Sequence, residues 1–126
     1  MRYLTAEEVL EINSLVMGGR RLLRDAGLLE SAVARPQASA FGVDAYPDVV
    51  SKAAALLHSL VLNHAFVDGN KRTAVLAMVV FLDLNGYMVS WDQEEALAFV
   101  LRLADHQVGL SDVAAFLRDR THPRNR

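Results

Sequence analysis

The sequence predicts an all-α domain of about six or seven helices around a buried central helix. Three observations support this prediction. Apolar residues recur at helical spacing along most of the chain, capping residues precede several of these stretches, and residues 37–47 fit neither the helical nor the strand period. Apolar residues make up 52% and charged residues 22% of the 126 residues, which is typical of a globular protein and excludes a disordered one. A chain of this length corresponds to one domain.

Composition and charge exclude further classes of protein. Cysteine is absent, so disulfide scaffolds, thiolate metal sites and cysteine nucleophiles are excluded. Residues 1–63 carry 6 basic and 7 acidic side chains and residues 64–126 carry 7 and 8, without the basic excess of a general nucleic-acid-binding protein. The longest apolar run, Ala74–Leu82, has nine residues, whereas a membrane-spanning helix needs about 20. With no signal-peptide pattern, we expect a cytoplasmic protein that binds neither membrane nor specific nucleic acid.

Helix signals are clear in the first half of the chain. Thr5 and Glu8 form a capping box, and the helix that follows ends at Gly18. A short helix is predicted over Leu28–Ala34, and Asp48 can cap the next one. One face of that third helix repeats at helical spacing through Ala53, Leu56, Leu57, Leu60, Val61 and His64.

The second half of the chain contains the predicted central helix. The segment Arg72–Leu84 is apolar nearly all round, so other helices should surround it. Asp83 interrupts it, and we expect this carboxylate to pair with a cation or to cap a backbone group. Ser90 or Asp92 is expected to cap the next helix, and Ser111 the last one.

Two segments fall outside the helical pattern. Residues 37–47, with Gly42, Pro47 and an aromatic residue near each end, predict a loop or a loose hairpin. Residues 118–126 are polar and contain Pro123, so a frayed end is expected. The predicted organisation is therefore one domain over residues 1–118 and a polar tail over residues 119–126.

The residues that suggest chemistry lie between the third helix and the predicted central helix. A helix start offers unpaired backbone N–H groups and about half a positive charge. Gly69 permits a close approach of a ligand to the backbone, and Lys71 and Arg72 add two full charges. Such a site favours an anion, above all a di- or triphosphate. The whole segment reads His64-Ala65-Phe66-Val67-Asp68-Gly69-Asn70-Lys71-Arg72-Thr73.

Asp68 and His64 complete this pattern. A carboxylate beside a phosphate site is unfavourable unless a divalent cation lies between them, and Mg²⁺ needs only one or two carboxylates plus phosphate oxygens. His64, at the end of its helix, can take a proton from an attacking hydroxyl. Base, metal ligand and phosphate site within nine residues indicate phosphoryl or nucleotidyl transfer. Taken singly, each feature also has a purely structural interpretation, as a core histidine, a turn or a solvated first turn.

The motif His-x-Phe-x-Asp-Gly-Asn-Lys-Arg at His64–Arg72 resembles the signature of the Fic/Doc superfamily, specifically its Doc (death-on-curing) branch. The resemblance extends to Gly27–Pro36, to the helix over Ala53–Asn63 and to Phe81–Tyr87, and it covers roughly residues 1–118. It implies a compact Fic-type helical core with one irregular flap.

The resemblance also implies roles for individual residues. It implies that His64 is the catalytic base, that Phe66 anchors the motif in the core and that Asp68 binds Mg²⁺. Residues 37–47 would be the flap that aligns the target chain. The implied nucleotide- and phosphate-binding residues are Gly69, Asn70, Lys71 and Arg72.

The sequence departs from the AMP-transferring Fic branch at three positions. Ala65 stands in place of a proline, Lys71 in place of a second glycine and Val75 in place of a second arginine. The Doc-type pattern instead implies transfer of the γ-phosphate of ATP to a Ser/Thr hydroxyl of a protein, with translation elongation factor EF-Tu as the implied target. Transfer of AMP to a protein hydroxyl remains an alternative, and a non-catalytic all-α binding module is a second one.

The resemblance finally implies a partner protein. Fic proteins often carry an inhibitory Ser/Thr-x-x-x-Glu helix, and the match here, Ser90–Glu94, is better explained as a helix cap followed by acidic residues. A toxic transferase without its own inhibitor needs a separate one. The resemblance therefore implies an antitoxin with a segment that folds against this chain near the site.

Overall fold

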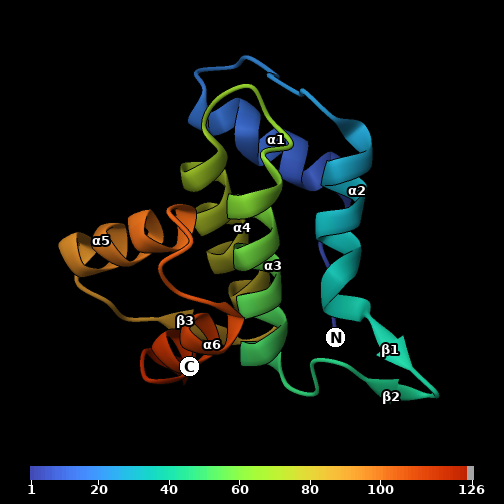
Figure 1. Cartoon of the computed structure of the whole chain (residues 1–126), viewed down its shortest axis with the longest axis vertical. Helices are drawn as coiled ribbons and strands as arrows, with labels where there is room; N and C mark the ends of the chain where they lie inside the picture. The colour runs from blue at the N-terminus through green and yellow to red at the C-terminus, as the bar shows by residue number, and fades with distance from the viewer. Residues whose placement is uncertain (125–126) are drawn as a thin grey trace.

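The computed structural model describes residues 1–124 and confirms the all-α prediction (Figure 1). Within this range the chain forms six α-helices: α1 (Ala6–Val16), α2 (Ala26–Ala34), α3 (Val49–Asn63), α4 (Asn70–Leu84), α5 (Gln93–Ala104) and α6 (Leu110–Arg118). A short 3-10 helix, η1 (Arg35–Gln37), follows α2. Two antiparallel pairs of short strands complete the fold, β1 (Ser39–Ala40) with β2 (Val43–Asp44), and β3 (Tyr87–Val89) with β4 (Thr121–Pro123).

The buried central helix is α3, not the Arg72–Leu84 segment that the sequence suggested. Eleven of the fifteen residues of α3 are buried, and Figure 1 shows it in green at the centre of the molecule. The following helix, α4, buries only one face, and Leu76 and Leu84 on it are 37% and 43% exposed. Its apolar character has another reason, because part of its outer face lines an open groove against α5.

The helix starts largely follow the predicted capping residues. Three expected N-caps are confirmed: Thr5, Asp48 and Asp92. The cap predicted at Ser111 is wrong. Helix α6 begins two residues earlier than a cap at Ser111 implies, with Gly109 as N-cap, and the Asp112 carboxylate accepts the Gly109 N–H at 2.8 Å.

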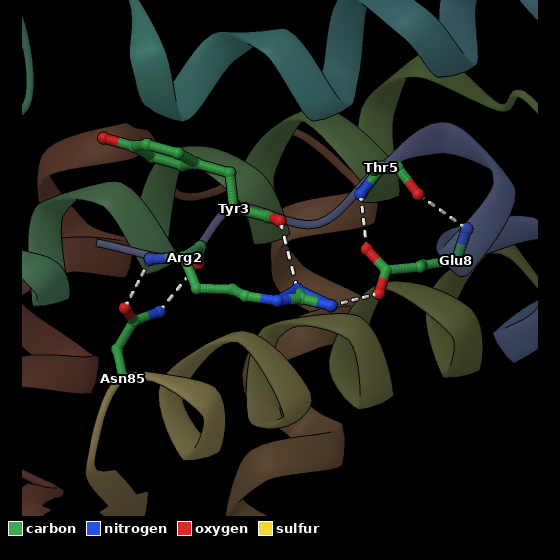
Figure 2. A network of polar contacts seen from close by, with 5 residues as sticks. All are labelled: Arg2, Tyr3, Thr5, Glu8 and Asn85. Carbon is green, nitrogen blue, oxygen red and sulfur yellow. Dashed lines mark hydrogen bonds and ion pairs between the residues drawn. The ribbon is translucent and has the colours of Figure 1, made fainter.

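The N-terminal segment is fastened to the end of α4. Figure 2 shows Arg2 and Asn85 joined by two hydrogen bonds, with the backbone N–H of Arg2 donating to Oδ1 and Nδ2 donating to the Arg2 carbonyl. The Arg2 guanidinium also reaches Glu8 at 2.6 Å, and Glu8 closes the capping box with Thr5. These contacts fix the start of α1 against the far end of α4. The other end of α1 consequently meets the start of α4, where the motif lies.

The expected frayed tail is wrong for the described part of it. Strand β4 pairs with β3, the Arg124 N–H donates to the Gly86 carbonyl, and the Arg124 guanidinium pairs with Asp83 at 2.5 Å. The predicted pairing of Asp83 with a cation is thereby confirmed. The strand pairing joins segments more than thirty residues apart, so local periodicity could not reveal it. Residues 125–126 of the expected tail lie outside the described residues.

Residues 37–47 form the loose hairpin that was one of the two expected forms, but not beside the motif. The hairpin precedes α3, whereas His64 is the C-cap of that helix, so the two lie at opposite ends of α3. Figure 1 shows β1 and β2 beside the end at which α3 begins. Fifteen helical residues span about 22 Å at the usual rise of 1.5 Å. The structure therefore places the hairpin away from His64, and its role as the flap that aligns a target chain stays a prediction.

The base of this hairpin is fastened by two cations. The Arg35 guanidinium donates to Tyr46 Oη and to Ser59 Oγ, both at 2.9 Å, and lies 2.8 Å from His58 Nδ1. Lys52, only 3% exposed, donates from Nζ to the Pro36 carbonyl at 3.1 Å. Arg35 and His58 therefore have structural contacts in the body of the fold.

Candidate active site

His64 occupies an unusual position at the end of α3. Its backbone is left-handed, with φ 51° and ψ 48°, and this conformation ends the helix. For a residue with a Cβ it costs about 1–2 kcal/mol, so the surrounding structure must hold it. The residue is exposed, which leaves its imidazole open to a ligand. The predicted base is thus accessible and held in a strained backbone conformation.

The segment after His64 is held by the connection between α1 and α2. Leu23 forms a β-bridge with Phe66, and the Val67 N–H donates to the Leu22 carbonyl at 2.6 Å. The backbone N–H groups of Arg24 and Asp25 both donate to the Ala65 carbonyl, at 2.8 and 3.0 Å. These hydrogen bonds hold residues 65–67 in a short extended segment against the connection between α1 and α2.

Phe66 and Asn70 form the inner support of the motif. The Phe66 ring is 2% exposed and belongs to the core, as an anchor requires. The Asn70 side chain accepts the Phe66 N–H at 3.0 Å and donates to the Phe66 carbonyl at 2.9 Å. Its amide group is therefore engaged with the motif itself.

The start of α4 is open to an anion. Among residues 1–124, no side chain caps this helix, because its N-cap is Gly69. The first N–H groups of a helix have no partner within the helix, so the amides after Gly69 point outward with the positive end of the dipole. Lys71 and Arg72 are both exposed in this first turn. Their charges oppose the helix dipole, which favours a bound anion that compensates both.

Glycine is required at position 69 for two reasons. Its φ of 77° is left-handed, and a Cβ there would lie 2.7 Å from Met17 Sδ. The end of α1 therefore packs directly against the turn that opens α4. A side chain at this position would displace the turn and the amides that follow it.

Sequence reasoning missed a buried asparagine that joins three segments. Asn13 of α1 is fully buried, and its Nδ2 donates to the Asp68 carbonyl and to Thr73 Oγ1, each at 3.1 Å. Its Oδ1 accepts the Leu22 N–H at 3.2 Å. One signal was available, because Asn13 lies four residues after Val9 and hence on the buried face of the helix. A polar residue on such a face needs partners.

Asp68 fits the Mg²⁺ role that the motif implies. The residue is exposed, and its Oδ1 accepts the Gly69 N–H at 2.7 Å. In the described part of the chain its Oδ2 has no hydrogen-bond partner, which leaves a hard oxygen donor beside the open helix start. Residues 1–124 contain no group of three or more His, Asp or Glu side chains suited to a metal. An ion here would take most of its ligands from a nucleotide and water, the usual arrangement for Mg²⁺.

An apolar groove begins beside this site. It measures about 510 Å³ and runs between α4 and α5. Lys71 and Arg72 belong to its lining, and Glu94 lies on the α5 side. Most of the other lining side chains are apolar: Val75, Leu76, Val79, Trp91, Ala96, Leu97 and Val100.

The structure therefore brings most of the predicted residues to one end of the α3–α4 pair. His64, Asp68 and the first turn of α4 are contiguous there, while Phe66 and Asn70 support them from within. The hairpin at residues 39–44 lies at the other end of α3.

Comparison with known proteins identifies the family. The model of the family described as Fic/DOC matches residues 3–82, which is more than half of the chain and includes the whole motif. The chain belongs to the Fic/DOC family. Two curated Fic/DOC relatives cover nearly all of it. Toxin Doc of Mycolicibacterium smegmatis is 49% identical over 117 residues, which is 91% of this chain and 90% of the relative.

The second relative of this Fic/DOC chain is more distant. Protein kinase doc of Escherichia phage P1 is 30% identical over 121 residues, or 94% of each chain. At these coverages both similarities extend beyond the motif into the α5 and α6 region. Over residues 1–124, no helix has the length and apolar character needed to cross a membrane.

Proposed function

We propose that this Fic/DOC protein is a Doc-type toxin that transfers the γ-phosphate of ATP to a Ser or Thr hydroxyl of a protein. The observation that carries the proposal is the uncapped start of α4, with exposed His64 and Asp68 directly before it and exposed Lys71 and Arg72 in its first turn. The similarity to a protein named as a kinase supports the reaction type. The similarity to Toxin Doc supports the biological role.

The proposed step needs a proton acceptor and a charge-stabilising site. The target hydroxyl oxygen bonds to the γ-phosphorus while the bond from that phosphorus to the β–γ bridging oxygen breaks and ADP leaves. The hydroxyl proton passes to the imidazole of His64, since histidine is the side chain that most often accepts a proton in such steps. His64 then returns the proton to solvent.

The residues after His64 would bind the nucleotide. The amides of the first turn of α4, with Lys71 and Arg72, attract phosphate oxygens and stabilise charge that develops on them. Asp68 would hold Mg²⁺, which neutralises phosphate charge when bound. Most of the catalytic effect then comes from positioning and electrostatics, as is usual in phosphoryl transfer.

The proposed target is elongation factor EF-Tu, whose modification would arrest translation. The test incubates the protein with EF-Tu, Mg²⁺ and ATP labelled on either the α- or the γ-phosphorus, beside His64→Ala. We expect label on EF-Tu from γ-labelled ATP only, and none with the variant. Label from α-labelled ATP would show AMP transfer instead, and absence of both labels with a correctly folded protein would refute transferase activity on this target.

A toxin of this kind needs an antitoxin, and we propose that an apolar segment of the cognate antitoxin packs in the groove between α4 and α5. Two features support this. The groove is lined mainly by exposed or half-buried apolar side chains, and it begins at Lys71 and Arg72 of the proposed phosphate site. A helix in this groove would restrict access of the nucleotide to the site.

A further inference from the structure

Arg24 makes an unusual pair of contacts with the backbone around the proposed base. Its guanidinium donates from Nε to the His64 carbonyl at 2.7 Å, and its Nη2 donates to the same oxygen. Nη2 also reaches the Asn63 carbonyl at 3.4 Å. The backbone N–H of the same residue donates to the Ala65 carbonyl at 2.8 Å. Arg24 thus donates hydrogen bonds to three successive carbonyls, those of Asn63, His64 and Ala65.

These contacts act on the torsion angles that place His64. The orientation of a residue's carbonyl is set by its ψ, so a guanidinium that fixes the His64 carbonyl fixes the left-handed conformation of this residue. Without that restraint the residue can relax toward the commoner right-handed region, which redirects the bond from Cα to Cβ. The imidazole would then leave the end of α3 in another direction.

A simpler role would be to cap the C-terminus of α3, because cations near a helix end stabilise its last carbonyls. That role explains the contact with Asn63. It does not require two donors on the carbonyl of the residue that leaves the helix, nor the backbone bond to Ala65 beyond it. The contacts are centred on His64 rather than on the helix end.

We infer that Arg24 is a positioning residue, which holds His64 in its left-handed conformation and thereby orients the imidazole toward the nucleotide site. The orientation of the imidazole for catalysis rests on the proposed function, whereas the hold on the backbone does not. Arg24 lies outside the motif, forty positions before His64 in the chain.

The first test is independent of any activity. A residue with positive φ gives a strong NMR cross-relaxation signal between its own amide and α protons. We expect this signal at His64 in the wild-type protein and a clear loss of it in Arg24→Ala. The matched control is Arg21→Ala, which removes a guanidinium from the same connection that pairs with Glu7 and Glu11 of α1. The control should keep the signal.

The second test measures the γ-phosphate transfer to EF-Tu described above. Arg24→Ala should lower kcat by about 10- to 100-fold, since a misplaced catalytic group typically costs that much, with the KM for ATP changed less than about twofold. Arg24→Lys, which can still donate to the carbonyl, should recover part of the NMR signal and of kcat together. If Arg24→Ala does not fold, Arg24→Met keeps the aliphatic stem, loses only the donors and takes its place in both tests.

Each result decides the inference. A folded Arg24→Ala that keeps the signal at His64, a loss of kcat with that signal unchanged, or an equal loss in Arg21→Ala would overturn it. If the signal is lost as expected while the wild-type protein transfers no phosphate, the hold of Arg24 on His64 stands and the proposed function fails.

Discussion

The side-chain amide of Asn70 forms two hydrogen bonds with the backbone of Phe66, accepting from its N–H and donating to its carbonyl. Phe66 is itself fixed in the core, so Asn70 ties the start of α4 to a buried point. The loop that carries Asp68 and Gly69 lies between these two residues. Its shape is therefore set from both sides before any ligand binds, which favours binding of a nucleotide without reorganisation.

Replacing Asn70 should test this support. Asn70→Ala removes two hydrogen bonds of about 1 kcal/mol each, so the free energy of unfolding should fall by about 1–3 kcal/mol. Asn70→Asp keeps the acceptor for the Phe66 N–H but cannot donate to the Phe66 carbonyl. Its free energy of unfolding should therefore lie between those of the wild type and Asn70→Ala. Urea unfolding followed by circular dichroism measures both. Equal stability of all three proteins would show that the bonds contribute nothing.

The contact of Gly69 with Met17 gives a second prediction. Gly69→Ala should destabilise the protein both through the strained φ and through the clash of the new Cβ with Met17 Sδ. Shortening the partner in Gly69→Ala/Met17→Ala relieves the clash but not the strain, so part of the loss should persist, about 1–2 kcal/mol. Thermal unfolding of the two single variants and the double variant separates the cost of the strained φ from the cost of the clash with Met17. A purely additive cycle would mean that the two side chains do not collide.

How far the sequence alone predicted this protein can be judged at particular residues. Thr5 and Asp48 were identified as caps, and Asp92 as one of two candidates, because a cap depends on three neighbouring residues only. The motif at residues 64–72 was found for a similar reason, since its groups are contiguous in the chain. Local patterns were sufficient for these features because the relevant partners lie within one or two turns, whereas at Ser111 a local pattern misled, since Gly109 caps α6 instead.

The features that were missed depend on distant partners. Asn13 meets Asp68 and Thr73 across more than fifty residues, and β4 meets β3 across more than thirty. Arg24 acts at a separation of forty. The form of the hairpin was predicted but its separation from the motif was not, because only the direction and length of α3 show that the hairpin lies at one end of that helix and His64 at the other.

Asp68 should govern the dependence on Mg²⁺. Asp68→Asn keeps an oxygen that can accept the Gly69 N–H, so the fold of the loop should persist while the charge for the metal is lost. We expect the Mg²⁺ concentration for half-maximal transfer to rise about tenfold or more, with circular dichroism unchanged. The control is Asp105→Asn, on the surface beyond α5. An unchanged Mg²⁺ dependence in Asp68→Asn would remove Asp68 from the metal role.

His58 should make the stability depend on pH. Burial lowers the pKa of this imidazole below 6.5, and the positive charges of Arg35 and His106 lower it further. In the unfolded chain His58 therefore takes up its proton at a higher pH than in the folded protein. The stability that it contributes is present above pH 6.5 and is lost as the pH falls through the lower folded pKa.

The measurement compares the free energy of unfolding of the wild-type protein with that of His58→Gln between pH 7.5 and 5. The wild-type value should fall more steeply over this range, because only the wild type must protonate a half-buried imidazole beside Arg35. Parallel profiles would show that His58 titrates alike in the folded and unfolded states.

The groove between α4 and α5 can be tested apart from catalysis. Leu97 of α5 lines it and is 60% exposed, so Leu97→Glu should be tolerated by the fold while placing a charge where an apolar antitoxin segment must pack. We expect the affinity for the cognate antitoxin to fall by at least about tenfold in calorimetry, with phosphate transfer unchanged and no longer suppressed by the antitoxin. Leu101→Glu is the matched control, since Leu101 is 44% exposed on the same helix outside the groove. Equal antitoxin affinity of the two variants would place the antitoxin on another surface.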